Sequence, residues 1–322
     1  MYGVIMAGGR GSRLQPLTDH RPKPMVPLLG RAVIDHVKDA MLDAGADTLV
    51  VTTGYRGEDL AAHVETWASA GISARVNHES TPMGTVGSVR LLIDELTETF
   101  LVGSGDGVST LNLGHLLDHH RATGALVTIG LVDVDDPSGF GIVGLSEGEQ
   151  GDVERGRTSG FVRRFLEKPT PEQAFSRLVN AGVYAVEPAA LRYVPEGKPF
   201  DFSRDLFPLL LAEEKAIGGI KLEGRWFDIG APHHLLDAQA SLLGDASANH
   251  LHAGVVINDG AKVSGSLLME NVHVEADAEL HRSILGVGAR VGHGAVLKRC
   301  VIGDGETVAP GEHLVDVRRP SP

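Results

Sequence analysis

Residues 2–14 read YGVIMAGGRGSRL, an apolar stretch that runs directly into a loop with three glycines. The stretch at residues 2–7 predicts a buried strand. The glycines allow a tight turn and let backbone N–H groups come close to a phosphate. Arg13 follows within the loop, and Lys23 stands between two prolines that stiffen the chain around it. Because a cation held in this way is poorly explained as a solvated surface charge, the segment predicts a phosphate-binding loop.

Around this loop, short apolar runs alternate with amphipathic stretches through the first two-thirds of the chain. This alternation predicts an α/β fold with a Rossmann-like, mostly parallel sheet and helices on both faces. Ligands of such sheets lie beyond the carboxyl ends of the strands, which is where the glycine loop begins. Further strands are expected at residues 48–53, 74–78, 100–102 and 125–132, and helices at 31–44, 59–70, 86–97 and 113–123.

The last third of the chain has a different period. Aliphatic residues recur there at alternating spacings of five and six residues, so the pattern repeats every 17 residues. This period predicts a triangular coil with three short strands per turn, each placing one aliphatic side chain inward. We expect a domain boundary near residue 248, with domains at 1–248 and 249–322. The inward set is Ile257, Val263, Leu268, Val274, Leu280, Leu285, Val291, Leu297, Ile302 and Val308.

Composition narrows the class of function. The formal net charge of −13 argues against a general nucleic-acid binder or an anionic-membrane binder, since both need a cationic face. No apolar run approaches the length of a membrane span, and the N-terminal run is too short for a signal peptide. Cys300 is the single cysteine, which excludes an internal disulfide and a multi-cysteine zinc site. We therefore expect a cytoplasmic protein.

The sequence GGRGSRLQPLTDHRPKPMVP at residues 8–27 resembles the signature of the sugar-nucleotide pyrophosphorylases, also called sugar-1-phosphate nucleotidyltransferases. Later motifs of that family follow in the same order, so the resemblance covers nearly the whole chain. It implies transfer of a nucleoside monophosphate from a nucleoside triphosphate to a sugar 1-phosphate, with release of pyrophosphate. The 17-residue repeat likewise resembles the left-handed parallel β-helix built on hexapeptide repeats.

The resemblance also implies roles for particular residues. Arg13 and Lys23 would contact the triphosphate, and Asp106 with Asp228 would hold Mg²⁺, a hard cation that takes carboxylate and phosphate oxygens. These four residues form the expected catalytic set. The expected nucleotide-binding residues are Ala7, Gly8, Gly9, Gly11, Ser12, Glu79, Pro82, Gly84 and Thr85; the expected sugar-phosphate-binding residues are Gly141, Glu167, Lys168, Asn180 and Gly182.

The substrates and even the class of activity have alternatives. The Lys23-Pro24 ending, the Met-Gly-Thr segment at residues 83–85 and the short coil look most similar to mannose-1-phosphate guanylyltransferases, which use GTP. Glucose-1-phosphate thymidylyl- and uridylyltransferases are the nearest alternatives, and a non-catalytic regulatory paralogue is an alternative of another class. An acyltransferase is a third alternative, because hexapeptide coils also occur in such enzymes. It would need a catalytic histidine in the coil, where His273, His281 and His293 are present. We expect a homo-oligomer formed through the coil, which hides its open end.

Overall fold

The computed structural model describes residues 1–54, 56–145 and 156–321. The chain forms two compact units, each built from segments that are far apart in the sequence. The first unit comprises Met1–Gly8 and His36–Trp226, and the second comprises Gly9–Asp35 and Phe227–Pro322. The expected domains 1–248 and 249–322 stay a prediction. Among the helices described, none is long and apolar enough to cross a membrane.

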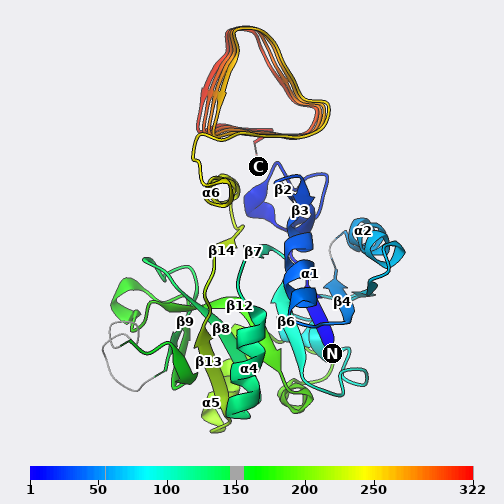
Figure 1. Cartoon of the computed structure of the whole chain (residues 1–322), viewed down its shortest axis with the longest axis vertical. Helices are drawn as coiled ribbons and strands as arrows, with labels where there is room; N and C mark the ends of the chain where they lie inside the picture. Colours follow the sequence, from blue (N-terminus) through cyan, green and yellow to red (C-terminus); the bar gives the residue numbers. More distant parts are fainter. Residues whose placement is uncertain (55, 146–155, 322) are drawn as a thin grey trace. The chain divides into compact units, whose positions relative to one another are not determined.

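A sheet forms the centre of the first unit (Figure 1). Eight of its ten described strands follow the order β10-β13-β8-β12-β6-β1-β4-β5, and the other two, β9 and β11, pair with each other and through β9 with β12. β1 (Tyr2–Met6) pairs in parallel with β4 (Thr48–Thr53) and β6 (Phe100–Ser104). β12 (Leu178–Val186) runs antiparallel between β6 and β8 (Val127–Asp133). The Rossmann-like α/β fold is therefore confirmed, and its sheet is mixed because β12 reverses the direction.

Helices and short strands complete this unit. The helix expected at residues 86–97 is shorter than predicted, because after Arg90 the backbone tightens into turns, with bonds from Leu92 N to Val89 O and from Ile93 N to Arg90 O. The other α-helices of this unit are α2 (Gly57–Ser69), α3 (Thr85–Arg90), α4 (Leu113–Thr123) and α5 (Phe207–Ala212), with short helical segments at Pro171–Gln173, Pro188–Tyr193 and Phe202–Leu206. Its other strands are β5 (Ser73–His78), β7 (Gly107–Ser109), β9 (Gly141–Gly144), β10 (Ser159–Phe161), β11 (Arg164–Glu167) and β13 (Ile217–Lys221). α1 (Val33–Asp43) and β14 (Trp226–Asp228) each include residues of both units.

The second unit contains the predicted β-helix, whose turns superpose into a triangular outline (Figure 1). Three parallel sheets form its sides. Leu267 pairs with Ile284, Ile284 with Val301, and Val301 with Arg318, each a step of 17 residues. The first sheet contains β15 (His250–Leu251), β18 (Leu267–Leu268), β21 (Ile284–Leu285), β24 (Val301–Ile302) and β27 (Arg318–Arg319). The second contains β16 (Val256–Ile257), β19 (His273–Val274), β22 (Arg290–Val291) and β25 (Thr307–Val308). The third contains β17 (Lys262–Ser264), β20 (Glu279–His281), β23 (Val296–Lys298) and β26 (His313–Val315).

The interior of the β-helix is the predicted aliphatic stack. Eight of the ten expected positions, from Leu268 to Val308, are buried. Ile257 is 36% exposed because the first turn of the coil has a neighbouring turn on one side only. α6 (Pro232–Leu243) precedes the coil, as expected, and Gln239 Nε2 on this helix donates to Ser266 O at 3.3 Å. α6 thus packs along the sheet that contains β18 (Leu267–Leu268).

We predict that Leu285→Ala lowers the free energy of unfolding by about 2–5 kcal/mol, because it leaves a cavity inside the coil. The matched control is Leu251→Ala, since Leu251 lies in the same coil but is 46% exposed; its cost should stay below about 1 kcal/mol. Denaturant unfolding monitored by circular dichroism measures both. Equal losses in the two variants would contradict the inward placement of Leu285.

Candidate functional site

The start of the glycine loop belongs to the first unit and lies beside residues 79–85, called the base segment here, which contain the expected nucleotide-binding residues Glu79, Pro82, Gly84 and Thr85. Ala7 N donates to Thr52 O at 2.8 Å, and Glu79 N donates to Thr53 O at 2.9 Å. Both residues thus follow directly from the paired ends of β1, β4 and β5. A Cβ placed on Gly8 would lie 2.8 Å from Glu79 Oε1, so only a glycine there lets the carboxylate approach the loop.

Glu79 is half-buried and oriented by its own segment. Its Oε2 accepts a hydrogen bond from Met83 N at 3.0 Å. Burial raises the pKa of the Glu79 carboxyl above its usual value, against the opposing effects of the Met83 N–H and His78. A carboxylate held in place in this way can accept further hydrogen bonds from a ligand.

The rest of the expected base segment makes structural contacts. Pro82 is exposed. The Thr85 hydroxyl donates to Asp201 Oδ1 at 2.9 Å and accepts from Phe202 N at 2.9 Å. Gly84 O accepts from Ser88 Oγ. Gly84 and Thr85 therefore hold α3 and the segment around residue 201 together, and their part in nucleotide binding stays a prediction.

The continuation of the loop belongs to the second unit. Gly9, Ser12 and Arg13 are exposed, and η1 (Ser12–Leu14) turns the chain directly after the glycines. Gly11 has φ +67°, and a Cβ on it would lie 2.7 Å from Lys23 Cβ. This close approach places the stem of Lys23, which is only 8% exposed, against the loop backbone. The loop therefore presents Arg13 outward and holds Lys23 close to its own backbone.

Asp228 and Arg13, predicted from motifs more than 200 residues apart, meet in the second unit. A Cβ on Gly230 would lie 3.0 Å from Asp228 Oδ2 and 3.3 Å from Arg13 Nη2, so both charged groups lie close to Gly230. Asp228 O accepts from Gly230 N at 2.8 Å and is 2.8 Å from His234 Nδ1. These contacts orient the backbone that carries the carboxylate.

Asp106 lies in the first unit, directly after the end of β6. Ser104 Oγ donates a hydrogen bond to Asp106 Oδ1. Gly105 N donates to Met6 O at 2.8 Å, which places Asp106 beside the end of β1. Ser104 therefore orients the Asp106 carboxylate. Among the described residues, no three histidine, cysteine or acidic side chains gather as a ready metal cluster.

Sheet pairing brings the expected sugar-binding residues of β9 and β11 together. Gly141 is the register partner of Glu167. A Cβ on Gly141 would lie 2.7 Å from Glu167 Oε2 and 2.6 Å from Phe165 Cζ, so the glycine makes room for both side chains. Burial raises the pKa of Glu167, while Lys168 and Arg204 lower it. Lys168 has φ +50°, an unusual conformation that turns the chain out of β11.

β12 adds the other two sugar-binding candidates. Asn180 Nδ2 donates to Tyr184 Oη at 2.9 Å and to Ser203 Oγ at 3.1 Å, while its Oδ1 accepts from Gly182 N at 2.9 Å. The pairing of Val179 in β12 with Ile142 in β9 places Asn180 next to the Gly141 strand. The amide group is thus fixed in one orientation, which a residue that recognises hydroxyl groups requires.

The sequence argument missed the residues that attach the loop to the coil. Arg21 Nη2 forms an ion pair of 2.6 Å with Asp304 Oδ2. Arg318 Nη1 donates to Arg13 O at 2.9 Å and to Gln15 O at 3.2 Å. A signal for Arg318 was present, because it occupies the repeat position that is aliphatic in the three preceding turns: Leu267, Ile284 and Val301.

Comparisons with known proteins agree with this arrangement. The family model described as nucleotidyl transferase matches residues 2–244, and a GlmU-like C-terminal hexapeptide model matches residues 231–316. A mannose-1-phosphate guanyltransferase of Candida albicans is 31% identical, over 91% of this chain and 88% of its own. A mannose-1-phosphate guanylyltransferase of Mycobacterium tuberculosis is 30% identical, over 96% of this chain and 81% of its own.

We predict that Gly141→Ala destabilises the chain by about 1–3 kcal/mol, because the new methyl group collides with Glu167 and Phe165. Gly139→Ala is the matched control, since a Cβ at this nearby glycine meets no described atom within 4 Å. Thermal unfolding of both variants tests the packing. The interpretation of Gly141 is wrong if the two variants unfold at the same temperature.

Proposed function

The chain belongs to the nucleotidyl transferase family, and from this we propose that it transfers GMP from GTP to mannose 1-phosphate, forming GDP-mannose and releasing pyrophosphate. The names of the relatives support these substrates, and the chain spans more than four-fifths of the first two relatives. The observation in the site that supports guanine most directly is the oriented carboxylate of Glu79 beside Gly8.

The reaction is an in-line attack by an oxygen of the sugar phosphate on the α-phosphorus of GTP. A phosphate monoester is largely dianionic at neutral pH, its second pKa being about 6, so the attacking oxygen needs no general base. The main obstacle is bringing two anions together, which requires positioning and charge neutralisation. We assign Arg13 and Lys23 to the triphosphate and Lys168 to the sugar phosphate.

Enzymes of this family generally use a divalent metal ion, and we propose that it is Mg²⁺ held by Asp106 and Asp228. Carboxylate oxygens suit a hard cation that keeps several positions for water and phosphate oxygens. The carboxylates fit this role chemically: the Ser104 hydroxyl orients Asp106, and Asp228 Oδ2 lies close to Gly230, so each offers a placed carboxylate to a hard cation. The bound ion would neutralise charge on the phosphates while Arg13 and Lys23 position them.

We predict that Asp106→Asn lowers kcat by at least about 10³-fold, since the amide replaces the charge that holds the metal, while the fold is retained. Pyrophosphate release measures turnover, and circular dichroism checks the fold. Asp94→Asn, at an exposed position of the first unit, is the control and should keep normal turnover. Near-normal turnover of the Asp106 variant would refute the metal assignment.

Guanine is the base that a carboxylate recognises best. Its Watson–Crick edge presents two adjacent donors, N1–H and the N2 amino group, and ionised carboxylate oxygens only accept. The same edge of thymine or uracil presents one N–H donor between two carbonyl oxygens. A carboxylate repels these two oxygens. Glu79 lies beside the start of the phosphate loop, where a bound nucleotide would extend its base. We therefore assign Glu79 to the guanine edge.

We predict that Glu79→Gln raises KM for GTP by about 10- to 100-fold, the loss expected for a hydrogen bond to a charged group. The ratio of kcat/KM for GTP to that for UTP should fall in the same variant, while kcat changes less. Because the pKa of Glu79 is raised, wild-type KM for GTP should also rise as the pH falls toward that value. Glu65→Gln on the exposed face of α2 is the control. An unchanged base preference would exclude Glu79 from base recognition.

The substrates can be identified together by measuring pyrophosphate release with Mg²⁺ for GTP, dTTP, UTP, ATP and CTP against mannose and glucose 1-phosphates. Release only with GTP and mannose 1-phosphate supports the proposal. Release with glucose 1-phosphate and dTTP or UTP would replace it with the thymidylyl- or uridylyltransferase alternative. Release with no combination, but restored on adding a catalytic paralogue, would indicate a regulatory protein.

We also propose that the protein is a homo-oligomer through its coil. The first turn of the β-helix exposes Leu251, Val256 and Ile257, and its strands have a neighbouring turn on one side only. Open strand edges with apolar side chains favour association with another chain. Val256→Asp should therefore shift the sedimentation of the protein toward the monomer. His281→Asp should not, because His281 is exposed on β20 (Glu279–His281), a strand with a neighbouring turn on both sides.

A further inference from the structure

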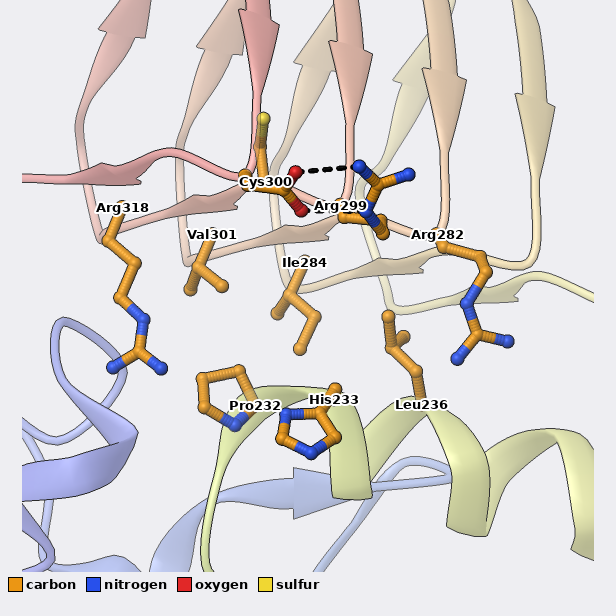
Figure 2. Close-up of a pocket in the computed structure, with 10 residues that line it drawn as sticks. Pro232, His233, Leu236, Arg282, Ile284, Arg299, Cys300, Val301 and Arg318 are labelled. Atoms are coloured by element: carbon orange, nitrogen blue, oxygen red, sulfur yellow. Dashed lines mark hydrogen bonds and ion pairs between the residues drawn. The ribbon is translucent and has the colours of Figure 1, made fainter.

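A cavity of about 440 Å³ lies within the second unit, between the first turns of α6 and the outer face of the β-helix (Figure 2). Its walls are largely apolar. Pro232 and Leu236 of α6 face Ile284 and Val301 of the coil across the space, as Figure 2 shows. The volume lies within the range of pockets that hold small organic ligands.

The charged groups at the rim of this cavity are mostly basic. Three arginines line it: Arg282, Arg299 and Arg318. Arg282 pairs with Asp237 at 2.6 Å, and Arg299 with Asp316 at 2.6 Å, so these two guanidinium groups are compensated. The hydrogen bonds of Arg318 are to carbonyl oxygens, which leave its positive charge in place.

The N-terminus of α6 makes this end of the cavity more electropositive, whereas His233 adds hydrogen-bonding atoms rather than charge. α6 begins at Pro232 with Ala231 as its N-cap, so the positive end of a 12-residue helix faces the space without a side-chain acceptor from its cap residue. His233 lies in the wall beside it. Burial lowers the pKa of His233, and the charges of His234, Arg318 and Arg282 lower it further against the effect of Asp237.

Arg318 connects this cavity to the phosphate loop. Figure 2 shows its side chain extending from the coil toward the N-terminal loop, where it donates to Arg13 O and Gln15 O. A phosphate beside Arg318 would compete for the same N–H groups, because hydrogen bonds between charged partners are about twice as strong as those to a neutral carbonyl. Occupancy of the cavity would therefore weaken the attachment of the loop that carries Arg13.

We propose that this cavity binds an organic phosphate, a phosphate monoester on a flat apolar body, and that the bound ligand lowers the affinity of the phosphate loop for the triphosphate. Arg318 pairs with the phosphate, and the body lies against Ile284 and Val301. The effect on the triphosphate rests on the proposed function, which assigns Arg13 to that substrate, whereas the binding itself does not.

Binding is tested by titrating phenyl phosphate and inorganic phosphate into the intact chain by calorimetry. Val301→Phe fills the cavity and should raise Kd for phenyl phosphate at least tenfold, as should Arg318→Gln. Val315→Phe is the matched control, because Val315 is a 53% exposed valine of the same coil outside the cavity wall, and it should leave Kd unchanged. Circular dichroism verifies that each variant folds.

Three results would overturn this binding site. One is equal phenyl phosphate binding by the wild type, Val301→Phe and Arg318→Gln, which would place any binding elsewhere. A second is equal affinity for inorganic phosphate and phenyl phosphate, which would remove the apolar body from the proposal. A third is the absence of binding by the wild type.

The coupling is tested by measuring KM for GTP with and without saturating phenyl phosphate. We expect KM to rise about fivefold or more in the wild type, within the usual range of coupling between sites, and to rise less in Val301→Phe. If phenyl phosphate only competed with GTP at the active site, KM would rise equally in Val301→Phe. The difference between the two rises of KM therefore reports on the cavity. An equal rise of KM in the wild type and in Val301→Phe would overturn the coupling.

The binding site and the proposed function can fail separately, because calorimetry measures binding without turnover. A chain that binds phenyl phosphate but releases no pyrophosphate would refute the proposed function alone.

Discussion

The candidate site residues of the first unit depend on one constraint, the parallel pairing of β1 with β4 and β6. The register aligns Met6 with Thr52 on one side and with Ser104 on the other, so the three strands end at one level. The glycine loop leaves one strand end, Asp106 follows another, and Glu79 follows the next strand outward, β5. Backbone pairing therefore brings together the glycine loop, the proposed metal-binding carboxylate of Asp106 and the proposed base-binding carboxylate of Glu79.

The second unit positions the other half of the loop by different means. Its 17-residue turns stack by backbone pairing, and this stack presents Asp304 and Arg318 at fixed points. The Arg21–Asp304 ion pair and the bonds from Arg318 to loop carbonyls then attach the loop to the coil. The β-helix is thus part of the loop's immediate surroundings. This attachment is the basis of the proposal that a ligand in the cavity beside Arg318 acts on the loop without entering the active site.

Glycine contacts explain why the site motifs have their composition. At Gly141 a Cβ would collide with the Glu167 carboxylate, and at Gly11 with the stem of Lys23. In both cases the charged residue is half-buried or buried against backbone, where a larger neighbour would displace it. The glycines of these motifs therefore set the distance between backbone and charged groups, which is the quantity that recognition of phosphate and sugar depends on.

The sequence by itself determined the alternating α/β region and the 17-residue coil, and it predicted a phosphate-binding role for the glycine loop. These features follow from local periodicity and from residues close together in the chain, which is the information that a sequence pattern carries. The tertiary structure decided the antiparallel direction of β12, the early end of α3 at Arg90, and the meeting of Arg13 with Asp228. It also revealed Arg318 as the link between coil and loop. These features depend on contacts between residues as many as 305 positions apart, and no local pattern specifies which distant partner a side chain will meet.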